Sequence, residues 1–330
     1  MFTSRFLTLN QTFCFSLILF FHFFNSQAQQ HMITPAALQK GDTIAIVATA
    51  RKYTDNELQP AIDLLHRWGL EVIIGKSIGL DNNQLAGTDE ERTADFQTQL
   101  DNPNIKAIWC VKGGYGTVRI IDSLDFTQFK KNPKWIVGFS DITVLHNHLN
   151  TLGYKTIHGI MPVSIPRATP EAIETLREAL FNEPIGYEIP SDPMNRSGEA
   201  KGELVGGNLS ILYSLFGSPS AIDCHEKILF IEDLDEYLYH IDRMMMNLKR
   251  NGCLESIKGI IVGSMTKMKD NEIPWGKNAV EIIEDVTKKY QIPVIYNFPA
   301  GHIQDNRALI LGSTVSMEVT PLKSTVKFED

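Results

Sequence analysis

The chain is poor in cysteine. Only four cysteines occur among 330 residues, and no two of them have C-x-x-C spacing. Cys14 lies in the N-terminal apolar stretch, which leaves three for the rest of the chain: Cys110, Cys224 and Cys253. The odd number and the spacing predict neither a disulfide framework nor a zinc site. Since no Cys/His cluster has ligand spacing either, we expect chemistry without a metal or other cofactor.

Clusters of basic residues are also missing. The formal net charge is -8, and Lys and Arg are scattered rather than grouped. Binding of nucleic acid needs clustered cations to neutralise phosphates, so we expect no nucleic-acid partner. The chain has no internal repeat and no low-complexity segment, and its 43% hydrophobic and 21% charged content is that of an ordinary globular protein. Its length suits two domains. Because the charge argues against nucleic acid, we expect small molecules or peptides as ligands.

A long hydrophobic run is absent except near the start of the chain. There, Arg5 precedes the apolar residues 13–24, and the small residues Ser26 and Ala28 follow. This pattern predicts a secretory signal peptide at 1–28, cleaved after Ala28. A membrane anchor is the alternative, but the run is shorter than the roughly 20 residues that a spanning helix needs. We therefore expect export, to the periplasm, with no stable membrane span after cleavage.

Residues 29–181 alternate between short apolar runs and helical periodicity. The pattern predicts strands at 42–48, 70–74, 105–111, 135–137 and 156–160, with helices at 54–68, 88–100, 142–152 and 170–181 between and after them. Such alternation is typical of a parallel sheet with helices on both faces, in which ligands bind beyond the carboxyl ends of the strands.

The second half of the chain is less regular. The polar, proline-containing residues 182–197 are the expected linker, and 198–330 the expected second domain. We predict helices after Gly206-Gly207-Asn208, at 237–249 and at 279–290, and strands at 227–231, 257–262, 314–319 and 324–328. This order indicates a mixed, β-rich domain with antiparallel pairing, in which the apolar positions of 237–249, methionines included, belong to the core.

Ser140 lies between a predicted buried strand and a predicted helix. A serine in a sharp strand-to-helix turn presents its hydroxyl beyond the sheet, close to the free N–H groups at the helix start. Gly138 fits such a turn, since strand and helix approach closely there. Ile142 departs from the full G-x-S-x-G pattern. The turn therefore indicates a nucleophile, but an ordinary serine N-cap is the alternative.

A serine nucleophile needs a base and an acid that orients it. Among nine histidines, His302 lies on a loop rich in proline and glycine between two strands, whereas His158 ends a strand and could line the same crevice. Glu232 ends a buried strand, with Asp233 beside it. The order serine, acid, histidine is that of α/β-hydrolases. The non-catalytic alternative is that Glu232 forms a surface ion pair with a cation such as Arg243.

Several stretches together resemble the LD-carboxypeptidases, serine peptidases that include murein tetrapeptide carboxypeptidases and microcin C immunity proteins. They run in the family's order across nearly all of the chain after the signal peptide: Leu38 to Ala45, Gly113-Gly114-Tyr115-Gly116 with Arg119, Pro133-Lys134, Gly138 to Thr143, Gly206 to Leu209, Ile231 to Asp233, Asp242-Arg243-Met244, and Gly301-His302.

The resemblance implies a Ser140–Glu232–His302 triad, with an oxyanion hole formed by backbone N–H groups of Gly113-Gly114 and of Asp141. It also implies an N-terminal doubly wound, flavodoxin-like domain, a C-terminal β-rich domain, an active site between them and a homodimer.

Two residues depart from the family pattern. Lys112 stands where an arginine is common, and Val205 where a tryptophan often precedes the Gly-Gly-Asn. The expected export is a further departure, because well-known members act in the cytoplasm. The expected reaction is metal-free hydrolysis of the bond between diaminopimelate and terminal D-alanine in murein tetrapeptides. Cleavage of a peptidyl-nucleotide antibiotic by the same residues, or muropeptide binding without cleavage, are the alternatives.

Overall fold

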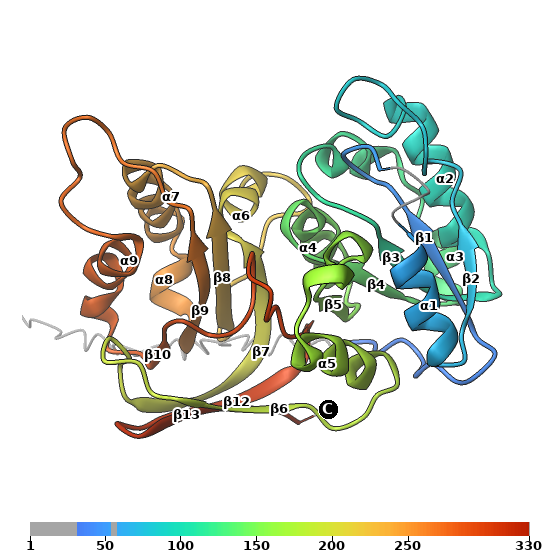
Figure 1. The fold of residues 1–330 in the computed structure, drawn as a ribbon. Helices are drawn as coiled ribbons and strands as arrows, with labels where there is room; N and C mark the ends of the chain where they lie inside the picture. The colour runs from blue at the N-terminus through green and yellow to red at the C-terminus, as the bar shows by residue number, and fades with distance from the viewer. Residues whose placement is uncertain (1–31, 54–57, 330) are drawn as a thin grey trace, which may run out of the picture. The chain divides into compact units, whose positions relative to one another are not determined.

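The computed structural model describes residues 32–53 and 58–329, and these form two sheets with helices packed against both (Figure 1). The expected signal peptide at 1–28 lies outside the described residues. Among the described residues, no helix is long and apolar enough to cross a membrane.

The first sheet has the strand order β11-β5-β4-β3-β1-β2. Its five consecutive strands are β1 (Thr43–Val47), β2 (Glu71–Ile74), β3 (Ile105–Cys110), β4 (Trp135–Gly138) and β5 (Thr156–His158). They pair in parallel, whereas β11 (Leu309–Leu311) pairs with β5 antiparallel. The parallel order 5-4-3-1-2 is the flavodoxin-like order, so the expected doubly wound sheet is confirmed.

Helices cover both faces of the first sheet, because alternate strand residues point to opposite sides. Ile44 and Ile46 share a core with helices α1 (Gln59–Arg67) and α5 (Pro170–Leu180). Ala45 and Val47 share another core with α2 (Asp89–Asp101), α3 (Thr127–Lys131) and α4 (Thr143–Thr151). The carboxyl ends of β3 and β4 carry the glycine turn at 113–116 and Ser140, as the strand pattern predicts.

The second sheet is mixed, as expected, and has the order β10-β9-β8-β7-β12-β13-β6. Its strands are β6 (Gly186–Pro190), β7 (Gly198–Asn208), β8 (Ile228–Leu234), β9 (Gly259–Thr266), β10 (Val294–Ile295), β12 (Thr314–Val319) and β13 (Lys323–Phe328). Strands β10, β9, β8 and β7 are parallel, and the rest pair antiparallel. Helices α6 (Leu209–Leu215), α7 (Leu238–Arg250), α8 (Cys253–Ser256) and α9 (Ala279–Thr287) accompany this sheet. Met244 and Met245 of α7 are buried in that core, as predicted.

Two strands lie in sheets that the sequence pattern does not predict for them. The expected linker at 182–197 contains β6, which pairs with β13 in the second sheet. Conversely, β11 comes from the C-terminal part of the chain and extends the first sheet. These pairings depend on contacts distant in sequence, which a local pattern of prolines and polar residues does not report.

Cys224 and Cys253 form a disulfide, contrary to the expectation from their spacing. The bond joins the segment before β8 to the start of α8; the two Cα atoms are 5.1 Å apart, and the sequence separation of the cysteines is 29. Cys110 is free and buried in β3. An odd cysteine count misled the prediction, because pairing depends on spatial proximity, which the fold alone sets.

The two halves meet where α4 passes β7. The hydroxyl of Thr143 accepts a hydrogen bond from the backbone N–H of Asn208 at 3.0 Å. A β-carbon added at Gly207 would lie 2.6 Å from that hydroxyl oxygen, and Gly207 has a φ of +137°. Glycine is required here by both the backbone conformation and the close approach of the helix that follows Ser140.

Substitution of Gly207 by alanine tests this contact. Gly217→Ala is the matched control, because Gly217 also has a positive φ but no atom within 4 Å of an added β-carbon. We expect Gly217→Ala to lower the free energy of unfolding by about 1–2 kcal/mol through backbone strain alone. Gly207→Ala should lower it by roughly 1–3 kcal/mol more through overpacking, as measured by urea unfolding. Equal losses would contradict the close approach.

Candidate active site

Ser140 lies in a strained turn at the carboxyl end of β4. Its φ is +64°, in the left-handed region that non-glycine residues seldom occupy. A β-carbon at Gly138 would lie 2.8 Å from the side chain of Ile142, so the turn needs glycine there, as predicted. Ser140 opens a short 3-10 helix, and α4 has Ile142 at its N-cap without a side-chain cap. The N-cap interpretation of Ser140 is therefore wrong.

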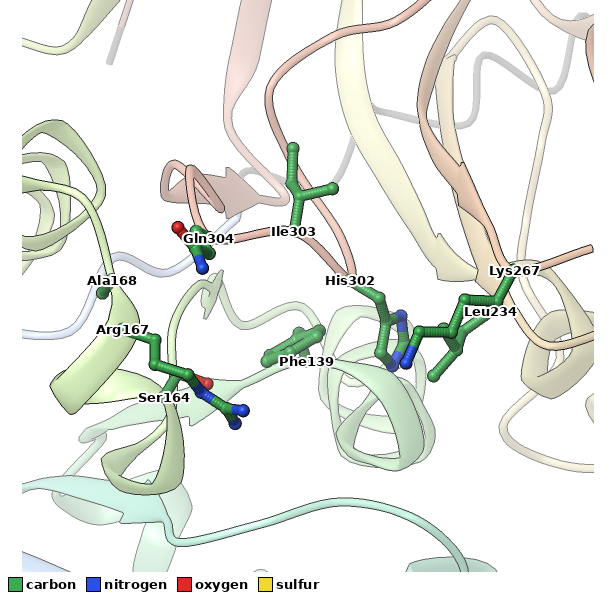
Figure 2. A pocket seen from close by; sticks show the side chains of 9 residues that line it. All are labelled: Phe139, Ser164, Arg167, Ala168, Leu234, Lys267, His302, Ile303 and Gln304. Atoms are coloured by element: carbon green, nitrogen blue, oxygen red, sulfur yellow. The ribbon is translucent and has the colours of Figure 1, made fainter.

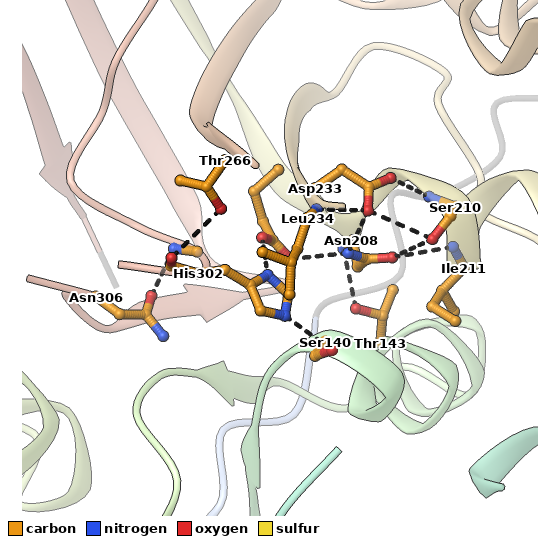
Figure 3. Close-up of polar contacts among 12 residues, drawn as sticks. Ser140, Thr143, Asn208, Ser210, Ile211, Asp233, Leu234, Thr266, His302 and Asn306 are labelled. Atoms are coloured by element: carbon orange, nitrogen blue, oxygen red, sulfur yellow. Dashed lines mark hydrogen bonds and ion pairs between the residues drawn. The ribbon is translucent and has the colours of Figure 1, made fainter. Parts of the chain in front are cut away.

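Ser140, His302 and Glu232 form one hydrogen-bonded chain. Figure 3 shows the contact between Ser140 and His302. The Nε2 atom of His302 lies 3.1 Å from Oγ of Ser140, and its Nδ1 atom lies 2.7 Å from Oε2 of Glu232. A carboxylate only accepts, so Nδ1 carries the proton and Nε2 is left to accept the serine hydroxyl. The structure thus brings together three residues from three distant parts of the sequence.

Glu232 is fully buried in β8, so its charge needs partners inside the protein. His302 is one of them, and the side-chain amide of Asn208 donates to Oε1 at 3.2 Å. Arg243 instead lies over the ring of Tyr239, with its guanidinium carbon 5.1 Å from the ring centre. The alternative of a surface ion pair between Glu232 and Arg243 is therefore wrong.

The pKa of His302 is raised above its ordinary value of 6.5. Burial by itself lowers the pKa of this imidazole, but the charge of Glu232 and its hydrogen bond favour the protonated ring and outweigh burial. Asp233 adds a smaller attraction. The arrangement stabilises an imidazolium at this position, which is the state that a histidine reaches after taking a proton from a serine.

Asp233 faces away from His302. Its carboxylate accepts hydrogen bonds from the backbone N–H of Ser210 at 2.9 Å and from the side-chain amide of Asn208 at 3.0 Å. Burial, and then repulsion from Glu232, raise the pKa of Asp233 to about 7. Asn208 therefore bridges the two carboxylates. The sequence marked it only as the last residue of the Gly-Gly-Asn stretch before a predicted helix.

The glycine turn after β3 lies against the serine. A β-carbon at Gly113 would be 3.3 Å from Oγ of Ser140 and 3.3 Å from the backbone nitrogen of Asp141. Within the described part of the chain, the backbone N–H groups of Gly114 and Asp141 donate no hydrogen bond to a protein acceptor. The buried carboxylate of Asp141 accepts from the backbone N–H of Thr117 at 2.9 Å and so ties the glycine turn to the serine turn. Burial raises the pKa of this carboxyl group.

His158 is not at the crevice, contrary to expectation. It is fully buried, with its ring centre 4.8 Å from that of Phe230, and burial holds its pKa well below 6.5. Its Nε2 atom lies 3.3 Å from Oδ1 of Asn306, which also accepts from the backbone N–H of Gly301 at 2.7 Å. Asn306, which the sequence did not single out, therefore anchors the loop that carries His302.

The two residues that depart from the family pattern lie in different surroundings. Val205 is buried in the core of the second sheet, where it pairs with Leu229, whereas Lys112 is half-buried next to Gly113.

Among residues 32–53 and 58–329, no group of three or more His, Cys, Asp or Glu side chains is placed to hold a metal ion.

Known proteins match this chain along most of its length. Family models described as the LD-carboxypeptidase N-terminal and C-terminal domains match residues 44–159 and 201–317. The chain is 35% identical over 304 residues to the probable murein peptide carboxypeptidase of Bacillus subtilis, covering 89% of this chain and 94% of that protein. It is 26% identical over 329 residues to the microcin C7 self-immunity protein of Escherichia coli, covering 88% and 94%.

A solved structure is similar along almost its whole length. The muramoyltetrapeptide carboxypeptidase of Oxalobacter formigenes superposes with a TM-score of 0.79 at 29% identity, covering 87% of this chain and 99% of that one. Both family models, the match over nearly the full length of the relatives and the shared fold lead to one conclusion: this chain belongs to the LD-carboxypeptidase family of peptidases.

Proposed function

We propose that this protein is a serine carboxypeptidase that hydrolyses the L,D-amide bond between diaminopimelate and the terminal D-alanine of murein tetrapeptides. The observation that carries the proposal is the hydrogen-bonded chain from Ser140 through His302 to the buried Glu232. The substrate follows from the relatives, whose names assign murein peptides and muramoyltetrapeptides to them. Family membership supports the class of reaction, and the geometry supports the choice of residues.

In the proposed reaction, Oγ of Ser140 attacks the carbonyl carbon of diaminopimelate while Nε2 of His302 takes the hydroxyl proton. The oxygen of the tetrahedral intermediate lies against the N–H groups of the Gly113-Gly114 turn and of Asp141. His302 then gives its proton to the nitrogen of D-alanine, which leaves. Water, activated by the same imidazole, hydrolyses the ester and restores Ser140. Glu232 keeps its charge throughout, and no metal is required.

A second candidate reaction is hydrolysis of an amide in a peptidyl-nucleotide antibiotic. The 26% identity to the microcin C7 self-immunity protein over 88% of this chain favours it, and the hydrogen-bonded chain of Ser140, His302 and Glu232 would serve for either amide. Comparing turnover of a murein tetrapeptide and of a peptidyl-nucleotide distinguishes the two reactions. A protein that binds muropeptide without cleaving it would turn over neither.

We further propose that the protein is exported and acts in the periplasm. The Cys224–Cys253 disulfide supports this, since disulfides persist in oxidising compartments and are rare in the cytosol. The apolar segment at 13–24, with Ser26 and Ala28 after it, supplies the export signal. The homodimer stays a prediction from the family resemblance.

Release of D-alanine from L-Ala-D-Glu-meso-diaminopimelate-D-Ala by the purified protein tests the proposed reaction. Ser140→Ala should fold normally and lose about 10³-fold or more in kcat, because the attacking oxygen is gone. D-Alanine is measured by an enzyme-coupled assay and folding by the thermal midpoint. A Ser140→Ala variant that keeps most of the activity would exclude Ser140 as the nucleophile.

Substitution of Glu232 by glutamine tests the role of its charge. We expect kcat to fall by roughly 10²-fold to 10⁴-fold, because glutamine stabilises neither the tautomer nor the imidazolium of His302. Wild-type kcat/KM should fall as the pH drops through the pKa of His302, above 6.5, where the base becomes protonated. In Glu232→Gln this fall in kcat/KM should occur at lower pH. The pKa of His302 should drop, because burial still disfavours its charged form while the attraction of Glu232 is lost.

Two neighbouring carboxylates provide controls for Glu232. Asp235 is exposed and forms an ion pair with Lys269 at 2.9 Å, so Asp235→Asn should change neither kcat nor the pH profile. Asp233→Asn should cost much less activity than Glu232→Gln, because its carboxylate does not contact His302. If Asp233→Asn were the inactive variant, Asp233 and not Glu232 would be the acid.

Counting thiols tests the proposed export. Cys110, Cys224 and Cys253 remain after removal of 1–28, and two of them are joined. Protein collected from the periplasm and denatured without reductant should therefore react with one equivalent of maleimide, and with three after reduction. Its mass should correspond to a chain that begins after Ala28. Three reactive thiols before reduction, or an intact N-terminus, would contradict export in the proposed form.

A further inference from the structure

A pocket of about 400 Å³ lies beside His302 (Figure 2). Phe139, Leu234 and Ile303 give it an apolar lining, and Arg167 and Lys267 supply two cations. Both halves of the chain contribute to its described lining. Phe139, Ser164, Arg167 and Ala168 precede the second sheet, whereas Leu234 ends β8, Lys267 follows β9 and residues 302–304 form the His302 loop. The pocket therefore exists only where the two halves meet.

The position of the pocket relative to His302 identifies the part of a substrate that it faces. Its described lining includes His302 but none of Gly113, Gly114 and Asp141, the residues of the proposed oxyanion hole. In acyl transfer by a serine, the imidazole gives its proton to the leaving nitrogen. The leaving group consequently lies next to His302, which places its remaining atoms in this pocket.

The two cations of the pocket have no ion-pair partner among the described residues. Arg167 ends the 3-10 helix Pro162–Arg167, and Lys267 follows β9. Asp305, an acid on the His302 loop, is already held by Arg307 at 3.0 Å. Figure 2 shows Arg167 and Lys267 at opposite ends of the pocket, with Phe139 between them. In a chain of net charge -8, two unpaired cations in a pocket beside His302 favour an anionic ligand.

We propose that this pocket binds the leaving amino acid and that Arg167 holds its free carboxylate. A guanidinium presents two parallel N–H groups that match a carboxylate, whereas the amine of Lys267 is a point charge on a flexible stem. Phe139 and Ile303 supply apolar contact for a small side chain such as a methyl group. The inference rests on the proposed function and explains why the enzyme would remove a terminal residue.

This assignment explains why a terminal residue would be preferred over an internal one. An internal residue has an amide in place of the carboxylate, so it carries no charge for Arg167 to pair with. The guanidinium would then lose water without gaining an anionic partner. Arg167 is thus a specificity residue that acts on binding, and its loss should appear mainly in KM.

The test compares two substrates: the tetrapeptide with a free terminal D-alanine and the same peptide ending in D-alaninamide. In Arg167→Gln, kcat/KM for the free acid should fall by about 10-fold to 100-fold, mainly because KM rises. This range corresponds to the loss of one hydrogen bond to a charged group. Turnover of the amide should change by less than about 3-fold, because it never gains that bond. Arg250→Gln, at the exposed end of α7, is the matched control and should alter neither. Arg167→Lys should keep part of the preference for the free acid.

Binding of D-alanine itself gives a readout that does not depend on turnover. In the Ser140→Ala background, Arg167→Gln should weaken D-alanine binding, measured by saturation-transfer NMR, and leave the weaker binding of D-alaninamide unchanged. If D-alanine is released but Arg167→Gln affects acid and amide alike, or neither, the inference fails and the proposed function stands. If no D-alanine is released although its binding depends on Arg167, the proposed function fails and the carboxylate site stands.

Discussion

The hydrogen bond between Glu232 and His302 is the interaction on which the rest of the site depends. A carboxylate that is fully buried is stable only with close partners, and Glu232 obtains them from the imidazole and from Asn208. This requirement fixes the ends of β7 and β8 and the loop after β10 relative to one another. It also sets the ring of His302 with Nε2 directed toward Ser140.

The serine must then arrive from the other sheet at hydrogen-bonding distance. Three features of the fold hold it there: the strained turn at Ser140, the close passage of α4 along β7 at Gly207, and the strand β11 that ties the end of the chain into the first sheet. The position at the carboxyl ends of parallel strands is the usual place for a ligand in such sheets. Neither sheet alone contains the complete hydrogen-bonded chain.

Charged groups of both signs lie around the site. Glu232 and Asp233 favour the protonated form of the His302 imidazole, and the carboxylate of Asp141 accepts a hydrogen bond from the backbone that follows the glycine turn. Two cations, Arg167 and Lys267, border the pocket that His302 helps to line. The carboxylates therefore stabilise an imidazolium, while the pocket attracts an anionic ligand, although the chain as a whole is acidic.

Local patterns in the sequence were sufficient for much of the fold. Apolar runs and helical periodicity predicted the doubly wound sheet and the buried methionines of α7, because these patterns reflect which face of one element is buried. Likewise, Gly138 and Ser140 indicated a strand-to-helix turn, since its backbone geometry is set by adjacent residues. Chemistry and family resemblance together selected Glu232 and His302.

The tertiary structure decided what those local patterns do not contain. Ser140 and His302 are 162 residues apart, and Glu232 and His302 are 70 apart, so their contacts follow only from the packed chain, which also buries His158 away from the crevice. The Cys224–Cys253 bond, the pairing of β6 and β11, and the place of Arg167 beside His302 have no local signature either. A sequence determines which face of each element is buried, whereas contact between distant residues follows from how all the elements pack together.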